Sequence, residues 1–301
     1  MNGKWSPNGI TVAGGNGKGD QLNQLNDALG FCIDENQTIY IADSYNHRII
    51  AWKKDATAGI IVAGGNGSGA EINQLNVPMN VIVDENTNTI IITDRGNQRI
   101  VRWPRENGTS GEIIIENINC WDLALDSSGC SLYVSDCEKN EIRRWKIGEK
   151  EGILVAGGNG KGDNLHQLNE PRSIFIDQNE SVYVADWKNH RIMKWIKDVK
   201  QGVIIAGGGG FGNSLKETGA PNGIVVDELG TLYVIEGNND RVMRWVKTAI
   251  QGELVVGSNG NGVEANQFNV PTNLAFDREN NLYALDGKNQ RVQKFQFGLL
   301  E

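Results

Sequence analysis

The sequence predicts an all-β protein, a six-bladed β-propeller with four antiparallel strands in each blade and an N-terminal strand that closes the last blade. A unit of about 50 residues recurs six times along the 301-residue chain. Each copy holds four short runs of β-forming residues separated by turn residues. A fourth-strand pattern also precedes the first copy. Four-stranded units of this period are typical of blades arranged around a central channel.

The first strand of each copy is a compact apolar run that ends in Asp, such as Val81–Asp84. Apolar side chains at successive positions must be covered on both faces, which predicts the innermost strand of a blade. The second strand, such as Ile39–Ala42, is rich in β-formers. The third alternates apolar and charged residues, and the fourth, such as Ile60–Ala63, leads into a glycine-rich stretch.

An aromatic residue closes the third strand of every copy. Successive closing aromatics are separated by 51, 42, 50, 50 and 50 residues. Their alternation with Lys and Arg would suit base stacking, but equivalent aromatics in all six copies favour packing between neighbouring blades. The closing aromatics are Trp52, Trp103, Trp145, Trp195, Trp245 and Phe295.

The strand count also predicts how the ring closes. The fourth-strand pattern at Ile10–Ala13 comes before the first copy, whereas the last copy ends with its third strand at residues 291–297. We therefore expect residues 10–13 to pair with residues 291–297. The repeat covers nearly the whole chain, so residues 1–301 are interpreted as a single domain.

Two recurrent motifs are interpreted as structural. Asp43 and Arg48 recur as a pair in most copies, which favours a cap on the turn between second and third strands over a catalytic pair. The glycine-rich stretches, such as Gly64–Gly69, resemble phosphate-binding loops, but a strand rather than a helix follows them. Glycine is instead expected where the turn needs a positive φ.

The pattern Pro-x-Gly-Ile-x-x-Asp, Tyr-Val-x-Asp and Asn-His-Arg-Ile resembles that of NHL repeats, and the chain is similar to a complete six-bladed NHL propeller over about residues 9–297. The resemblance is specific for fold and not for function. It leaves open ubiquitin-ligase or RNA readers, extracellular modules, lyases and calcium-dependent hydrolases. A lyase of this type would need metal-binding histidines, and His47, His166 and His190 are not placed suitably.

The overall composition and charge limit the classes of partner that the chain is expected to bind. A net charge of -8 and a pI near 5.1 disfavour binding to nucleic acid or to an anionic membrane. The apolar runs are too short to span a membrane. No signal peptide precedes the repeat in the chain as given, and the sequence does not decide between secretion and the cytoplasm. We expect a monomer.

The copies differ most between the second and the third. A connection of about 15 residues precedes the first strand in most copies, whereas Ile115–Cys120 runs almost directly into the next strand. This deletion explains the spacing of 42 and predicts a notch in the rim above blade three. Cys120 replaces the usual Pro there, and Trp121 and Asp122 follow it.

We interpret the chain as a non-catalytic propeller that binds a protein, a peptide or a small anionic ligand on the loop-rich face near blades two to four. The best pocket is expected between Trp121, Asp122, Arg172 and Trp187. The predicted ligand-binding residues are Trp121, Asp122, Arg172, Trp187, Arg95 and Lys188.

Two alternatives remain open. One is an enzyme at the channel mouth, a calcium-assisted hydrolase or a lyase, and the other is an RNA reader, which the acidic charge disfavours. Six residues that lie four positions before the strand-ending Asp should form a ring at that mouth: Gly30, Asn80, Asp122, Ser173, Gly223 and Asn273. No cofactor is expected, the alternative being calcium held by Asp122, Asn80 and Asn273.

The sequence further predicts that Cys120 and Cys137 face one another across the first hairpin of blade three. Pairing Asp126 with Ser131 across the first hairpin places Cys120 opposite Cys137. Directly opposed residues of an antiparallel pair approach closely enough for a strained bridge.

Overall fold

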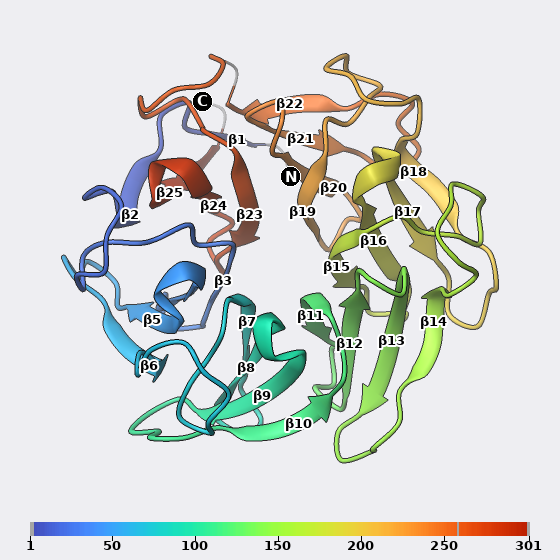
Figure 1. Ribbon diagram of the computed structural model, residues 1–301. Helices are drawn as coiled ribbons and strands as arrows, with labels where there is room; N and C mark the ends of the chain where they lie inside the picture. Colours follow the sequence, from blue (N-terminus) through green and yellow to red (C-terminus); the bar gives the residue numbers. More distant parts are fainter. Residues whose placement is uncertain (1–2, 258, 300–301) are drawn as a thin grey trace.

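The computed structural model describes residues 3–257 and 259–299 as six four-stranded antiparallel sheets arranged around a central channel (Figure 1). The predicted all-β six-bladed propeller is therefore confirmed. The described residues contain no helix with the length and hydropathy that a membrane span needs.

Each blade runs outward from an innermost first strand. Blade one comprises β3 (Gly30–Ile33), β4 (Ile39–Asp43), β5 (Arg48–Trp52) and β6 (Ile60–Gly64). Blade two comprises β7 (Pro78–Asp84), β8 (Thr89–Asp94), β9 (Arg99–Pro104) and β10 (Glu112–Glu116). Blade three comprises β11 (Cys120–Leu125), β12 (Ser131–Asp136), β13 (Glu141–Lys146) and β14 (Ile153–Gly157).

The other three blades follow the same order. Blade four comprises β15 (Pro171–Ile176), β16 (Val182–Asp186), β17 (Arg191–Trp195) and β18 (Val203–Gly207). Blade five comprises β19 (Pro221–Val226), β20 (Leu232–Glu236), β21 (Arg241–Trp245) and β22 (Glu253–Val256). Blade six comprises β23 (Pro271–Phe276), β24 (Leu282–Asp286), β25 (Arg291–Phe295) and, from the N-terminal region, β2 (Ile10–Gly14).

The ring closes as predicted, through the pairing of β2 with β25, in which Ile10 lies opposite Lys294 and Gly14 opposite Arg291. The third strand ends at Phe295, earlier than the predicted residue 297. Residues beyond it form β26 (Phe297–Leu299), which pairs with β1 (Gly3–Trp5) in a separate two-stranded sheet. This second closure was not predicted because two three-residue strands carry no periodic pattern.

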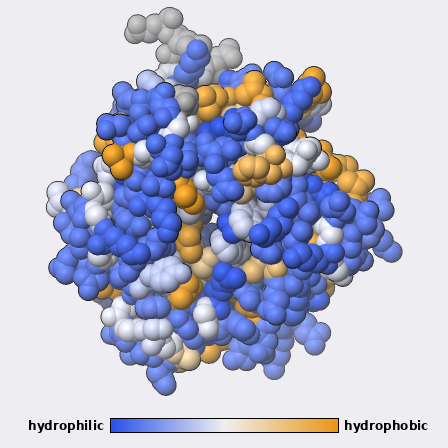
Figure 2. All heavy atoms as spheres, turned by 45° about the horizontal axis from the view of Figure 1, so that its top comes forward, coloured by the Kyte–Doolittle hydropathy of each residue, from blue (hydrophilic) through white to orange (hydrophobic). Residues whose placement is uncertain are grey.

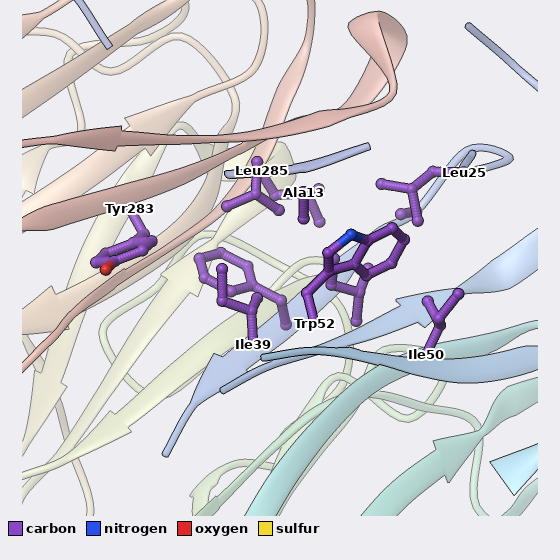
Figure 3. Packing of buried hydrophobic residues seen from close by; sticks show 11 residues of the cluster. Ala13, Leu25, Ile39, Ile50, Trp52, Tyr283 and Leu285 are labelled. Atoms are coloured by element: carbon purple, nitrogen blue, oxygen red, sulfur yellow. The ribbon is translucent and has the colours of Figure 1, made fainter. Parts of the chain in front are cut away.

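The closing aromatics pack between neighbouring blades, as predicted. Trp52 of blade one is buried with Leu25, with Ala13 of β2 and with Leu285 of β24 (Figure 3). Leu25 belongs to the long connection that precedes blade one, so the connection contributes to the core between blades six and one. Burial of these apolar side chains stabilises each blade interface.

The recurrent Asp–Arg pair caps the turn and also fixes the long connection. Arg48 Nε donates to Asp43 at 2.7 Å, and Asp43 also accepts a hydrogen bond from the Asn46 amide in the turn. Both side chains are buried. The remaining guanidinium nitrogens of Arg48 donate to the carbonyls of Asp20 and Gln24 in the connection. The pair is therefore structural.

Candidate functional site

The missing connection before blade three leaves only residues 117–119 between β10 and β11. In blade four the corresponding connection occupies residues 158–170. The rim above blade three is therefore notched, as the sequence predicted. Figure 2 shows a mainly hydrophilic surface with a narrow opening at the centre of the ring.

Bulges in two first strands direct side chains toward this rim. The register of β11 with β12 shifts between Cys120 and Leu123, which places Trp121 in the bulge. The register of β15 with β16 shifts at the same repeat position, and Arg172 lies in that bulge. A bulge leaves its extra residue unpaired and turns the side chain away from the regular alternation. Trp121 and Arg172 occupy equivalent positions in adjacent blades.

Short 3-10 turns supply the other three side chains of the cluster. Arg95 opens the turn η2 (Arg95–Asn97), and Trp187 and Lys188 open η3 (Trp187–Asn189). These turns join second and third strands on the face that carries the bulges.

The structure brings five of the six predicted ligand-binding residues into one cation–π cluster. The Arg172 guanidinium carbon lies 3.5 Å from the Trp187 ring centroid and 4.1 Å from that of Trp121. Arg95 lies 5.1 Å from the Trp121 centroid, and Lys188 lies 4.3 Å from that of Trp187. Each indole therefore faces two cations, and Arg172 faces both indoles.

A pocket of about 300 Å³ lies against this cluster. Of the four residues expected to bound the best pocket, Trp121 and Arg172 line this one, whereas Asp122 and Trp187 do not, and Arg95 lines it as well. Asp122 is buried in the channel ring, and Trp187 lies against Arg172. The remaining lining residues were not predicted: Asn119, Cys137, Glu138, Asn140, Lys161 and Glu170.

The two arginines of the pocket lack an acidic partner. Within the described residues, neither Arg95 nor Arg172 has a carboxylate oxygen within 4.0 Å. Arg95 Nε donates to the Asn119 amide oxygen at 2.9 Å, and Arg172 donates to that of Asn222. Desolvation lowers the pKa of Arg172 to about 9. The guanidinium still carries its charge at neutral pH.

Asp122 sits in the ring at the channel mouth. Its Oδ1 accepts hydrogen bonds from the Asn80 amide and from the Leu123 N–H, and its Oδ2 accepts one from the Ile174 N–H at 2.9 Å. Burial raises the pKa of this carboxyl above its usual range. Both oxygens therefore face N–H donors from three blades, so Asp122 ties blades two, three and four together.

The three residues predicted as calcium ligands are only partly brought together. Asn80 contacts Asp122, whereas Asn273 lies in blade six, and its Oδ1 accepts a hydrogen bond from the Leu274 N–H. Across residues 3–257 and 259–299 no group of three or more His, Cys, Asp and Glu side chains is arranged to hold a metal ion.

The predicted pairing of Cys120 with Cys137 is wrong. The register shift in the bulge places Asp136, not Cys137, opposite Cys120. The Cys120 thiol is buried in the core between blades two and three, whereas the Cys137 thiol faces the Asn119 carbonyl. Both are free thiols, as are Cys32 and Cys130. The counting that aligned the two cysteines assumed a regular hairpin, and the bulge adds one residue.

A model of the NHL repeat matches residues 25–52, the first three strands of blade one. A sequence comparison with curated proteins gives no match. Solved structures do match. A structural genomics protein of unknown function from Bacteroides thetaiotaomicron has a TM-score of 0.77 at 16% identity, covering 98% of this chain and 77% of the other.

Two further structures have named activities. An auxiliary nutrient binding protein from Bacteroides thetaiotaomicron has a TM-score of 0.74 at 15% identity, with 98% and 77% of the two chains covered. A catalytically inactive virginiamycin B lyase from Staphylococcus aureus has a TM-score of 0.61 at 11% identity, with 97% and 89% covered. At these identities the likeness concerns the fold alone. The NHL match in blade one and the six-bladed ring together identify the chain as an NHL-repeat β-propeller.

Proposed function

We propose that this propeller is a non-catalytic binding protein that holds a ligand with a carboxylate or another small oxyanion in the pocket beside Trp121. The observation that supports the proposal is the convergence of Arg95 and Arg172 on one indole without an acidic partner. A planar guanidinium matches a carboxylate through two parallel N–H donors. The indole supplies an apolar wall for the rest of the ligand.

Because the Arg172 guanidinium is desolvated between two indoles, we expect Arg172 to discriminate more strongly between ligands than Arg95 does. Its flat faces lie against Trp121 and Trp187, so only the edge of the guanidinium remains for hydrogen bonding. An anion at that edge would offset the cost of desolvating the charge. Glu138 and Glu170 also line the pocket, and Glu170 lies 3.7 Å from Lys161. These acids would disfavour ligands with several negative charges.

The proposal is tested by calorimetric titration with short peptides that carry a free C-terminal carboxylate, with the same peptides amidated, and with inorganic phosphate. We expect the free carboxylate to bind at least tenfold more tightly than the amide. Arg172→Met and Trp121→Ala should each weaken binding by tenfold or more. Arg278→Met removes one exposed cation elsewhere and is the matched control.

Two results would contradict the proposal. Equal affinity for acid and amide would remove the role of the arginines. A Trp121→Ala variant with intact affinity would remove the aromatic wall. Preferred binding of phosphate would support the second form of the proposal, in which the two arginines hold a small inorganic oxyanion instead of a carboxylate.

A further inference from the structure

In five blades the long connection before the first strand makes the same backbone hydrogen bond to the segment before the fourth strand. In each, the glycine just before the fourth strand donates its N–H to a carbonyl of the connection, at 2.6 to 2.8 Å. The residue that accepts is usually Leu or Ile. The donor and acceptor pairs are Gly9 and Ala265, Gly59 and Leu22, Gly111 and Ile72, Gly202 and Leu165, and Gly252 and Leu215.

Two side chains of the third-strand region hold each connection in place. In blade one, Asn46 donates to the Gly19 carbonyl, and Arg48 donates to carbonyls of residues 20–24. Blade three has Lys139 and Glu141 at these two positions. Glu141 pairs with Arg143 at 2.6 Å instead. The loss of the connection and the loss of its two anchors therefore occur in the same blade.

The deletion leaves a groove between blades two and three. The groove has a volume of about 840 Å³ and is lined by Ile113, Ile115 and Ile118 on one side and by Trp145, Arg143 and Gly152 on the other. Within the described residues no backbone carbonyl accepts the N–H of Gly152. Trp145 is 8% exposed, against 1% for Trp52 and for Trp195.

The inner part of the groove is already filled. Ile118 is buried beside Trp145, where the other connections place Leu25, Leu75 or Leu168 against their own core. What blade three lacks is the outer part of the connection, which carries the residue whose backbone carbonyl accepts the glycine N–H in the other five blades. Residues 117–119 are too few to supply it.

We infer that this groove docks an extended segment of a partner protein that presents a Leu or Ile side chain and directs its backbone carbonyl to Gly152. The chemistry of the occupant is taken from the five connections, four of which place a Leu or Ile, 43% to 59% exposed, at the residue whose carbonyl accepts the glycine N–H. Main-chain hydrogen bonding provides affinity, and the apolar wall selects the side chain. The groove and the Trp121 pocket share no lining residue, so this inference does not depend on the proposed function.

The test uses a fluorescein-labelled peptide with the sequence of residues 67–76, which contains Ile72 of the blade-two connection. We expect saturable binding by fluorescence anisotropy and at least a tenfold loss when the peptide carries Ile72→Ser. In the protein, Ile113→Glu should also cost tenfold. Ile204→Glu is the matched control, because Ile113 and Ile204 occupy the same register position in β10 and β18.

A second variant replaces residues 117–119 with residues 65–77 and so fills the groove with the chain's own connection. It should abolish peptide binding while the thermal midpoint stays within a few degrees. Trp121→Ala should leave peptide affinity unchanged, which separates this inference from the proposed function. Absence of saturable binding, or full affinity in Ile113→Glu, would overturn it. Self-association abolished by Ile113→Glu in sedimentation would assign the groove to a second copy and also overturn it.

Discussion

Arg105 of blade two supplies a cation that blade one lacks. In four of the other blades a Lys or Arg of the third strand faces a second-strand Tyr, as Lys194 faces Tyr183 and Lys294 faces Tyr283. In blade one this position is Ala51, opposite Tyr40. Arg105 reaches across the interface, donates to the Tyr40 hydroxyl at 2.8 Å and pairs with Asp34 and Glu85.

Replacing Arg105 with Ala should lower the free energy of unfolding substantially. The Arg105 and Asp34 side chains are only 10% and 2% exposed, so Arg105→Ala leaves a nearly buried carboxylate without its cation. Loss of one partner from a buried pair costs about 3 to 5 kcal/mol. Asp34 keeps hydrogen bonds from the N–H groups of Asn36 and Thr38, which favours the lower end, about 3 kcal/mol.

Urea unfolding followed by circular dichroism measures this difference. Arg102→Ala is the control, because among the described residues Arg102 pairs only with the exposed Glu112, at 3.8 Å, and its loss should cost less than about 1 kcal/mol. Adding Ala51→Lys to Arg105→Ala returns a cation to the usual position and should restore part of the stability. Equal losses in Arg105→Ala and Arg102→Ala, or no recovery with Ala51→Lys, would refute the argument.

Four further predictions concern the ring and the thiols. Asp122→Asn should lower the free energy of unfolding by about 2 kcal/mol, because one N–H donor loses its acceptor. Burial raises the pKa of Asp122 in the folded state, so the contribution of this carboxyl to the free energy of unfolding should fall as the pH rises above its ordinary pKa of 3.8. A difference in unfolding free energy between wild type and Asp122→Asn that grows with pH would contradict this. Calcium at 5 mM, a concentration on the order of weak protein sites, should leave the thermal midpoint unchanged, whereas a rise abolished by Asp122→Asn would establish a site. Alkylation followed by mass spectrometry should modify the exposed Cys130 first and Cys120 only on unfolding, and a Cys120–Cys137 bridge would refute the observed register.

The repeat made the fold predictable, since each blade repeats the same apolar pattern and the same closing aromatic. Sequence equivalence also located Trp121, Arg172, Arg95, Trp187 and Lys188 on one face, because residues at matched repeat positions occupy matched places in the ring. The register within a blade was less accessible. A bulge changes pairing by one residue without a compositional marker, and this is why the Cys120–Cys137 pairing failed.

The remaining residues that line the pocket could not be predicted from the sequence for another reason. Asn119, Glu138 and Asn140 come from a connection and a turn that are ordinary in composition. They line the pocket because the long connection that covers this turn in other blades is missing before blade three. Comparison of Lys139 and Glu141 with the Asn and Arg of the other copies could have indicated that the turn of blade three has lost its cover.

One deletion accounts for both surfaces. In blade one the end of the long connection lies against the turn, where the Tyr45 N–H donates to the Asn26 carbonyl. In blade three the turn is instead met by residue 119, whose carbonyl accepts the Cys137 N–H, and Glu138 and Asn140 then line the pocket. The same shortening leaves the buried Trp145 8% exposed, the most of the six closing aromatics, and, within the described residues, leaves the Gly152 N–H without a backbone acceptor. Variation between copies, rather than the shared residues, therefore gives this ring its two distinct surfaces.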